Sequence, residues 1–212
     1  MYLPAHFEEN RLDVLHRLLR AYPLGFLVTM QNGELNANHI PFEISPSEGR
    51  FGTLRAHVAR ANPVWREVNS DVDALVVFQG AQTYVTPSWY VTKQRTGMVV
   101  PTFNYLAVHA YGPLRVIEDR AWLRGLVERL TQKFEGVRAA PWAVSDAPAP
   151  FIEKQLEAIV GLEIPVAKLI GKWKASQNRP ADDQQGVIHG LLEDGGEQAL
   201  EMAAVIAART DP

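Results

Sequence analysis

Residues 24–44 read LGFLVTMQNGELNANHIPFEI, and the fold prediction starts from this stretch. Two strand-like runs, 24–31 and 34–44, flank Asn32-Gly33, a dipeptide typical of tight hairpin turns because such turns need residues that tolerate a positive φ. Further strands are expected at about 51–57, 74–78, 83–86, 102–117 and 162–173, with Gly112-Pro113 interrupting the fourth of these. Most of the strands follow one another as hairpins, which favours an α+β barrel over an alternating βαβ sheet.

Helices are expected at the ends of the chain and at the crossings between strands. Asn10 can cap a first helix, which Pro23 ends, and Asp119 can cap the most strongly patterned helix of the chain. The apolar side of that helix comprises Trp122, Leu123, Leu126, Val127, Leu130 and Phe134. Shorter helices are expected from Asn62-Pro63 through Val68 and over 151–160, and the end of the chain is expected to be helical through 197–209.

The composition is that of a globular protein, and it excludes several kinds of function. The chain has 212 residues, of which 47% are hydrophobic and 21% charged, and its net charge is -3. An acidic balance argues against a general nucleic-acid binder, whose affinity comes from accumulated Lys and Arg. The absence of cysteine excludes disulfides and thiolate chemistry. With no signal peptide at its start and no membrane-spanning run, the chain is expected to be cytoplasmic.

Acidic residues are missing from three long stretches even though the chain as a whole is acidic. No Asp or Glu occurs in 49–66, 74–117 or 164–181, whereas each stretch contains several Lys, Arg or His residues. The acids gather instead at the C-terminal end. One interpretation is a site prepared for an anion. The alternative is that strands simply disfavour Asp and Glu.

Five clusters mix aromatic rings with hydrogen-bonding groups in a way that a folding core does not require. They occupy residues 38–42, 55–63, 84–90, 100–105 and 171–178. Such a mixture suits a pocket for a planar ligand with polar edges. His39 in the first cluster is a candidate for a hydrogen bond to such a ligand, and Trp89 and Tyr90 are candidates for stacking on it. A half-buried structural histidine and aromatics that cover a barrel end are the alternatives.

The second cluster is the first choice for a phosphate. Arg55 and His57 lie on a strand, and Arg60 follows where Asn62-Pro63 begins a helix, so that guanidinium groups and backbone amides meet there. The alternative is a surface arginine beside a structural Asn cap.

The last cluster supplies the second-choice contacts. Lys174, Ser176 and Gln177 offer a cation and several neutral donors, the set that an anionic cofactor needs. A polar loop after a strand is the alternative here. No catalytic residue is assigned, since the chain has no nucleophile elbow, no glycine-rich phosphate loop and no helix-turn-helix pattern. The histidines lack the close spacing of a metal site, so no metal is expected.

Across these clusters the chain resembles the PaiB family of FMN-binding negative transcriptional regulators. The resemblance covers nearly the whole chain, from Met1-Tyr2-Leu3-Pro4 to Ser176-Gln177-Asn178, and its combined motifs are specific. Two departures occur: the family usually has Ile-Ser where this chain has Val85-Thr86, and Trp where it has Phe103. Each substitution keeps the character of the side chain.

The resemblance implies a split β-barrel of the FMN-binding type over residues 1–178, with flanking helices and a helical appendage, 179–212, packed on the same domain. It also implies FMN as cofactor and a homodimer with flavin sites at the subunit interface, where Trp89, Tyr90 and Phe103 are candidates to meet the partner. The expected function is a flavin-binding transcriptional regulator, with contact to DNA that is weak or made through another regulatory protein.

Two other functions stay open at this point. One is a flavin-dependent oxidoreductase related to pyridoxamine-phosphate oxidases or flavin reductases, in which FMN carries the hydride chemistry. The other is a barrel that has lost flavin and serves only as a dimer scaffold. The absorption spectrum of the purified protein separates the scaffold from the flavoproteins, and consumption of NAD(P)H separates the enzyme from the regulator.

Overall fold

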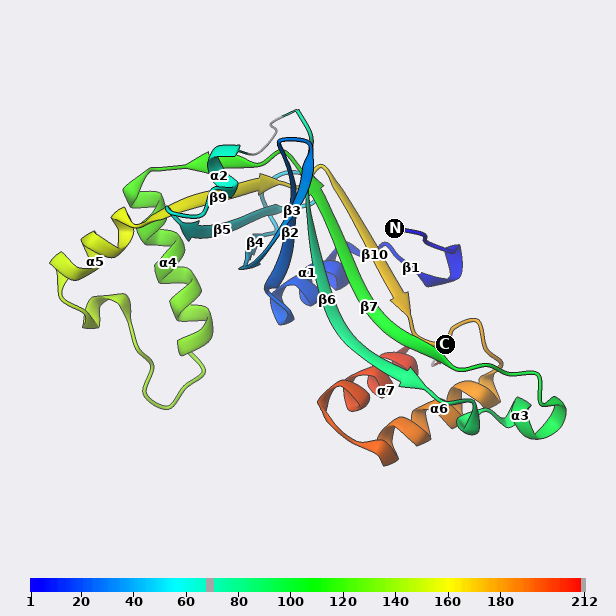
Figure 1. Cartoon of the computed structure of the whole chain (residues 1–212). Helices are drawn as coiled ribbons and strands as arrows, with labels where there is room; N and C mark the ends of the chain where they lie inside the picture. Colours follow the sequence, from blue (N-terminus) through cyan, green and yellow to red (C-terminus); the bar gives the residue numbers. More distant parts are fainter. Residues whose placement is uncertain (68–70, 211–212) are drawn as a thin grey trace. The chain divides into compact units, whose positions relative to one another are not determined.

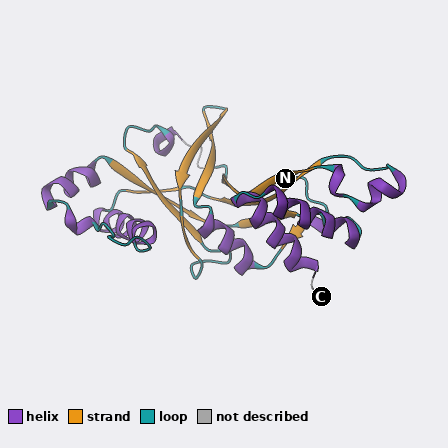
Figure 2. Ribbon diagram, turned by 90° about the horizontal axis from the view of Figure 1, so that it is seen from below, coloured by secondary structure: helices purple, strands orange, loops and turns teal. Residues whose placement is uncertain are grey.

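The structure of the protein is a computed structural model that describes residues 1–67 and 71–210. It divides into two compact units, each built from segments far apart in the sequence (Figure 1). Unit 1 comprises residues 1–18, 79–109 and 170–212, and unit 2 comprises residues 19–78 and 110–169. Both strands and helices contribute throughout, as the colouring of Figure 2 shows, and the expected α+β class is confirmed.

Unit 1 holds four neighbouring strands and most of the helical residues near the chain ends. Its strand order is β1-β10-β7-β6, and β1 pairs with β10 in antiparallel register. Its elements are η1 (Ala5–Phe7), β1 (Glu8–Glu9), most of α1 (Leu12–Ala21), the second half of β6 (Ala74–Val85), η2 (Pro87–Trp89), α3 (Val91–Thr96), most of β7 (Thr102–Gly112), most of β10 (Lys168–Lys174), α6 (Ala181–Asp194) and α7 (Glu197–Thr210).

Unit 2 contains a hairpin that pairs with the first half of β6, and a separate sheet in the order β4-β5-β9-β8. Its elements are β2 (Leu24–Gln31), β3 (Glu34–Pro41), β4 (Glu43–Ser45), β5 (Thr53–Ala59), α2 (Val64–Glu67), β8 (Arg115–Ile117), α4 (Arg120–Glu135), η3 (Val144–Asp146), α5 (Ala149–Glu157) and β9 (Ile159–Pro165). The helices α4 and α5 pack through a small core of Leu123, Val144, Ile152 and Leu156.

The hairpin predicted at Asn32-Gly33 is confirmed. Strands β2 and β3 pair from Leu24↔Pro41 to Gln31↔Glu34, and both turn residues have positive φ, 50° at Asn32 and 86° at Gly33. The prediction of one strand over 34–44 is corrected, because β3 ends at Pro41 and β4 belongs to the other sheet. Between them the side chain of Phe42 is buried, and its backbone N–H donates to the carbonyl of Pro23 at 2.8 Å.

Strand β6 is continuous from Ala74 to Val85, whereas the sequence predicted a break at 79–81. Two features keep the strand intact. The side chain of Gln79 donates to the carbonyl of Leu106 at 3.2 Å, and Gly80 leaves room for Leu18, whose Cδ1 would stand 2.9 Å from any added Cβ. A glycine in a strand therefore marks close packing here and not a turn.

Three further boundaries differ from the sequence prediction. The expected loop at 87–99 contains η2 and α3, and the expected strand at 162–173 is divided into β9 and β10 by Val166-Ala167. The helix expected over 151–160 ends at Glu157, and Ile159 already pairs with Ala59 in the sheet. Strand propensity at this point wins over the helical pattern because the β-branched residues are buried between neighbouring strands.

Helix α4 begins where the sequence predicted. Its cap, Asp119, accepts a hydrogen bond at Oδ1 from the backbone of Trp122 at 2.7 Å. Leu123, Leu126 and Leu130 are buried, but Phe134, which was predicted on the same face, is 44% exposed. Val68, the expected end of the short helix, lies outside the described residues. Among the described residues no helix is long and apolar enough to cross a membrane.

The helical end of the chain is confirmed, and α6 packs on η2 through two glycines. An added Cβ at Gly186 would stand 2.0 Å from the carbonyl oxygen of Trp89, and one at Gly190 would stand 2.3 Å from the indole. Helix α7 is linked to β6 by a hydrogen bond from the Gln82 backbone to the side chain of Gln198, at 3.1 Å. Trp89 is thus a packing residue of this unit.

We predict that Gly186→Ala destabilises the protein by about 1–3 kcal/mol, because the added methyl group forces the helix off the backbone of Trp89. Gly125→Ala in the middle of α4 is the matched control. Its Cβ would meet only the flexible end of Arg129, at 3.2 Å. There the gain in helix propensity should stabilise the fold by up to about 1 kcal/mol. Urea unfolding of both variants measures the difference, and equal effects would contradict the packing described.

Candidate functional site

A polar hollow of about 90 Å³ lies within unit 1, between the start of β7 and the turn that follows β10. It is lined by Tyr90, Val100, Pro101, Thr102, Asn104, Lys174, Ser176, Asn178 and Arg179, and we call it the cationic pocket. Thr102 and Asn104 reach it together because residues two apart on a strand lie on the same face. The residues of β10 and its turn come from the third acid-free stretch of the sequence.

Lys174 is held at one side of the cationic pocket by the first residues of β7. Its ammonium group donates hydrogen bonds to the hydroxyl of Thr102 and to the carbonyl of Phe103. Burial lowers the pKa of Lys174, and the positive charges of Lys172 and Arg179 lower it further. Since an ammonium group has three donors, one N–H remains for a ligand.

Ser176 is fixed in an unusual conformation. Its φ is 62°, in the left-handed region that residues other than glycine seldom adopt, and its side chain is buried. The hydroxyl oxygen accepts a hydrogen bond from the amide of Asn104 at 2.9 Å, which leaves the hydroxyl proton available to a ligand. Backbone strain of this kind concentrates at functional sites, where the surrounding structure maintains it.

The turn around Ser176 is stabilised by Gln177. The side-chain oxygen of Gln177 accepts from the backbone of Ala175 at 2.7 Å, and its amide donates to the carbonyl of Trp173. A further backbone bond runs from Arg179 to the carbonyl of Ser176, at 2.9 Å. Gln177 therefore positions the pocket without lining it.

Arg179 supplies the second cation of the cationic pocket. Its guanidinium carbon lies 4.5 Å from the centroid of the Tyr90 ring, a cation–π contact with a side chain that is only 1% exposed. Burial raises the pKa of the Tyr90 hydroxyl, with a smaller contribution from Asp183 and an opposing one from Arg179. Tyr90 therefore stays a neutral phenol at physiological pH.

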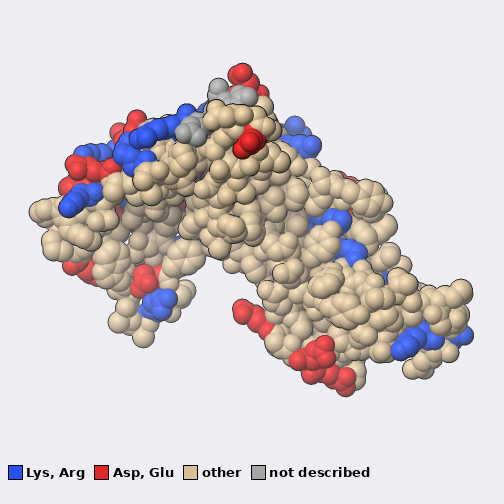
Figure 3. All heavy atoms as spheres, viewed as in Figure 1, with Lys and Arg blue, Asp and Glu red and all other residues tan. Residues whose placement is uncertain are grey.

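The electrostatics of the cationic pocket favour an anion. Its lining includes Lys174 and Arg179, and none of the described lining residues is a carboxylate. Acidic side chains of unit 1 gather instead over the turn between α6 and α7, where Glu193, Asp194 and Glu197 are exposed (Figure 3). Cations that share a hollow without counter-charges create a positive potential that attracts anions.

The ten residues predicted from the sequence are divided between the two units. Of the five in unit 1, Tyr90, Lys174 and Ser176 line the cationic pocket, while Trp89 packs on α6 and Gln177 shapes the turn. His39, Arg55, His57, Arg60 and Asn62 belong to unit 2. The sequence prediction missed Thr102, Asn104 and Arg179. The first two stand in a polar-aromatic cluster, and alternation along a strand was the signal that pointed to them.

The two predicted arginines of unit 2, Arg55 and Arg60, are bonded to other residues of the chain. The three nitrogens of the Arg60 guanidinium bond to Glu118 at 2.5 Å, to the carbonyl of Glu157 at 2.9 Å and to that of Ile159 at 3.2 Å. Arg55 pairs with Glu48 at 2.5 Å and with Glu163 at 3.1 Å. The carboxylates of Glu48, Glu118 and Glu163 therefore compensate their positive charges and would repel a phosphate.

The polar residues of unit 2 are also engaged or uncharged. Asn62 donates to the side chain of Asn38 at 2.9 Å, and its oxygen caps α2 by accepting from Val64 at 3.0 Å. His39 is exposed and meets Phe26 edge to face at 4.5 Å. Burial lowers the pKa of His57, so that this imidazole is neutral near pH 7. A neutral imidazole offers little attraction to a phosphate.

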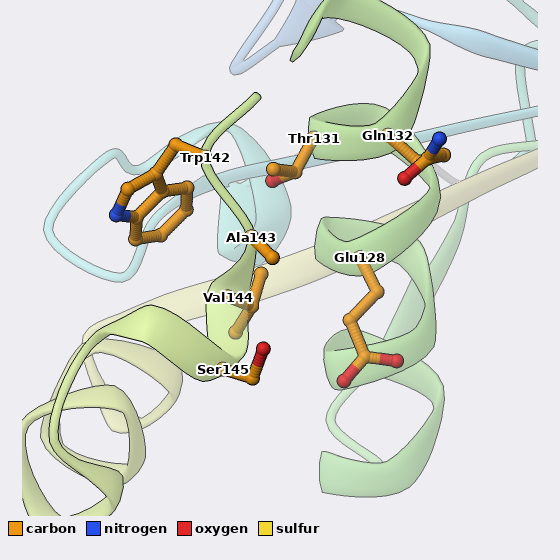
Figure 4. A pocket seen from close by; sticks show the side chains of 7 residues that line it. All are labelled: Glu128, Thr131, Gln132, Trp142, Ala143, Val144 and Ser145. Atoms are coloured by element: carbon orange, nitrogen blue, oxygen red, sulfur yellow. The ribbon is translucent and has the colours of Figure 1, made fainter. Parts of the chain in front are cut away.

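A hollow of about 170 Å³ in unit 2 is unsuited to an anion for another reason. It lies between α4 and the segment 142–145, and Glu128 is the only charged side chain among its described lining residues (Figure 4). Thr131, Gln132 and Ser145 add neutral polar groups. A carboxylate at this position repels a phosphate, so the cationic pocket of unit 1 is the better candidate for an anion site.

Comparison with known sequences identifies relatives along the whole chain. The profile of the family described as "Putative FMN-binding domain" matches residues 1–168. The chain is 31% identical over 209 residues to the "Protease synthase and sporulation protein PAI 2" of Bacillus subtilis, covering 97% of this chain and 96% of that one. It is 34% identical over 256 residues to an uncharacterised protein of Aspergillus fumigatus, covering 100% and 98%.

Solved structures resemble the fold at low sequence identity. A protein from Mycobacterium smegmatis described as binding FAD and heme matches with a TM-score of 0.58 and 21% identity, over 90% of this chain and 80% of its own. A flavocytochrome from Azotobacter vinelandii matches with a TM-score of 0.57 and 16% identity, over 79% and 69%. These likenesses show the fold alone, and they confirm the expected α+β split β-barrel with flanking helices.

We predict that Lys174→Gln does not lower, and slightly raises, the stability of the ligand-free protein near pH 7, by no more than about 1 kcal/mol. A lysine whose pKa is lowered on folding binds its proton less readily in the folded chain, so the charge opposes folding below that pKa. The advantage of the variant should shrink as the pH rises towards the ordinary pKa of lysine.

Urea unfolding at neutral and alkaline pH measures this difference. Lys154→Gln, at an exposed position on α5, is the matched control and should show little change at either pH. A Lys174→Gln variant that is clearly less stable than the parent at neutral pH would show that the two hydrogen bonds of Lys174 outweigh the cost of its charge.

Proposed function

The chain belongs to the PaiB-like family of FMN-binding domains, and on that premise we propose that it binds FMN. The phosphate of FMN lies in the cationic pocket in this proposal, and the protein acts as a dimeric flavin-binding regulator of transcription. The observation that carries the proposal is the convergence of Lys174, Ser176 and Arg179 on one hollow whose described lining contains no carboxylate. FMN would supply redox chemistry when bound, and the residues of this chain would hold and orient it.

The donors of the cationic pocket fit a phosphate. A phosphate monoester carries between one and two negative charges at neutral pH and several acceptor oxygens. Lys174 retains one N–H donor, Ser176 retains its hydroxyl proton, and Arg179 is only partly buried over the Tyr90 ring. Such charge-assisted hydrogen bonds are the strong ones. An anion here would also relieve the repulsion among the cations.

The size of the cationic pocket restricts what it can enclose. At about 90 Å³ it is well below the roughly 300–1,000 Å³ of pockets that enclose a drug-sized ligand. It can therefore hold a phosphate group but not a flavin ring. We propose that the isoalloxazine lies outside it and is covered by other surfaces, which fits a cofactor shared with a second subunit.

The alternative phosphate position at Arg60, the first choice from the sequence, is less favourable in this structure. Binding there would place the phosphate beside the Glu118 carboxylate, which pairs with the guanidinium at 2.5 Å and repels an anion. Three of the five N–H donors of Arg60 are already bonded within the chain. The pocket of the second-choice set, Lys174 and Ser176, has no carboxylate in its described lining.

A homodimer is proposed from an exposed group of apolar side chains in unit 1. Tyr84 and Phe103 meet edge to face at 5.7 Å, and both are about half exposed. Met98 and Val100, in the segment before β7, are exposed as well. Of the three earlier candidates, Tyr90 is buried and Trp89 packs on α6, so Phe103 is the residue that fits a partner.

Direct contact with DNA is proposed to be weak and electrostatic. Sequence-specific readout needs an element that enters a groove and cations that dock it. In this chain Arg55 and Arg60 of unit 2 are paired, Lys174 and Arg179 are assigned to the phosphate of FMN, and the turn between α6 and α7 is acidic. Regulation would then depend on flavin or on a second protein.

Tight FMN-insensitive binding to one DNA sequence at physiological salt, measured by gel shift, would contradict this proposal of weak contact with DNA.

We predict that Lys174→Gln and Arg179→Gln each weaken FMN by roughly ten- to a hundredfold, because each removes one charge-assisted contact to the phosphate. Binding of riboflavin, which lacks the phosphate, should change little in the same variants. Fluorescence titration of both flavins against each protein measures the two effects separately.

The control for this experiment is Arg60→Ala in unit 2. We expect it to leave the ratio of FMN to riboflavin affinity unchanged, although it should lower stability by removing the bonds to Glu118 and the two carbonyls. A selective loss of FMN in Arg60→Ala, with none in Lys174→Gln, would place the phosphate in unit 2. Equal losses of both flavins in every variant would show that no charge contact to the phosphate exists.

We also predict that Phe103→Asp converts a dimer into a monomer, because a carboxylate cannot be buried in an apolar interface without a partner. Light scattering at micromolar concentration measures the mass of the parent and the variant. Phe151→Asp is the control, since Phe151 is similarly exposed, at 53% against 56%, but lies on α5 in unit 2. A parent protein that is already monomeric would refute the dimer.

A further inference from the structure

A second basic hollow in unit 1 shares no residue with the cationic pocket. It is lined by residues of α1, of α7 and of the end of β10, and its volume is about 260 Å³. Its lining residues are Arg11, Val14, Arg17, Trp173, Val205, Ala208 and Arg209, and we call it the arginine hollow. Two guanidinium groups from the first twenty residues and one from residue 209 thus line the hollow together with apolar side chains.

Two of the guanidinium groups are oriented by one buried carboxylate. Glu9 accepts from the Arg11 side chain at 2.9 Å and 2.7 Å and from Arg209 at 2.5 Å, while its own side chain is only 4% exposed. Burial alone would raise the pKa of Glu9, but the bonds from Arg11 and the charge of Arg209 outweigh it and lower that pKa. Glu9 therefore stays ionised and fixes residues 11 and 209 side by side.

The third guanidinium is weakly committed. Arg17 pairs with Asp13 at 3.0 Å, and both side chains are about two-thirds exposed. Ion pairs of this kind contribute little because water and salt screen them. Arg17 follows Val14 by three residues and so lies beside it on α1, and Arg11 directly precedes the helix. Its donors can turn to an anion in the hollow at little cost.

The floor of the arginine hollow is apolar. Val14 of α1, Val205 and Ala208 of α7, and the nearly buried indole of Trp173 present carbon atoms to it. The described lining contains no carboxylate, because Glu9 and Asp13 hold the arginines from outside it. A ligand that fits both parts must join a negative charge to an apolar body.

We propose that the arginine hollow is a binding site for a small carboxylate with an apolar body. The carboxylate lies between Arg17 and the pair that Glu9 orients, where a guanidinium can bind both of its oxygens. The apolar body rests on Val14, Val205 and Trp173. At about 260 Å³ the hollow suits a small molecule and not a nucleotide. The site is independent of flavin binding.

The test uses phenylacetate as the probe, titrated calorimetrically into the full chain with and without saturating FMN. We expect millimolar or tighter binding that FMN does not change. Phenylacetamide, which has the same ring but no charge, and acetate, which has the charge but no ring, should each bind at least about tenfold more weakly. No binding of phenylacetate at about 10 mM, equal binding of either matched probe, or displacement by FMN would overturn the proposal.

Two variants locate the site on the chain. Arg17→Gln should weaken phenylacetate about five- to tenfold by removing one charged donor, and Ala208→Phe should abolish binding by filling the hollow at an exposed position. Arg20→Gln is the matched control, because Arg20 is an exposed arginine of the same helix that does not line the hollow. A loss in Arg20→Gln equal to that in Arg17→Gln, or unchanged binding in Ala208→Phe, would refute the assignment.

Discussion

The contact between the end of β10 and the start of β7 is the interaction on which the candidate site depends. Lys174 bonds to Thr102 and Phe103, and Ser176 accepts from Asn104, so that residues more than seventy positions apart form one wall. Only the pairing of β7 with β10 can bring them together. Without it nothing would maintain the left-handed backbone of Ser176, and Arg179, three residues later, would lose the turn that directs it to Tyr90.

This arrangement is not one that stability alone would select. Burial and two neighbouring cations all lower the pKa of Lys174, and a buried serine is kept at a positive φ that glycine would adopt at no cost. Local rules that are broken together at one place point to a functional site. A bound anion would compensate the charges, and by mass action it would stabilise the folded chain in proportion to its affinity. The unfavourable features therefore support anion binding.

Much of the fold could be predicted from the sequence because its signals are local. The Asn32-Gly33 turn, the Asp119 cap and the helical end of the chain each depend on a few neighbouring residues. The missed features depend on distant ones. Strand β6 continues through Gly80 because Leu18 packs there, and Phe134 is exposed although it follows the helical pattern of α4. The local sequence pattern shows neither the contact of Gly80 with Leu18 nor the exposure of Phe134.

The same difference explains which site residues the sequence could identify. An acid-free stretch shows where cations gather, and several residues of the stretch around Lys174 line the cationic pocket. It could not show that Arg60 meets Glu118, which stands 58 positions later, or that two carbonyls accept hydrogen bonds from its other nitrogens. The charge of a side chain can be read from sequence, but its partners cannot, and the partners decide whether the charge is available.

The basic regions of this protein also differ in how many N–H donors of their arginines are already bonded within the chain. Arg60 gives three of its five N–H donors to acceptors within unit 2, and one of these acceptors is a carboxylate that compensates its charge. The buried carboxylate of Glu9 binds fewer donors of each arginine. Arg11 donates two side-chain hydrogen bonds to it and Arg209 donates one. An arginine has five N–H donors, so such partial pairing fixes a guanidinium and still leaves N–H groups for a ligand. A buried acid beside a basic hollow can thus prepare an anion site instead of neutralising it.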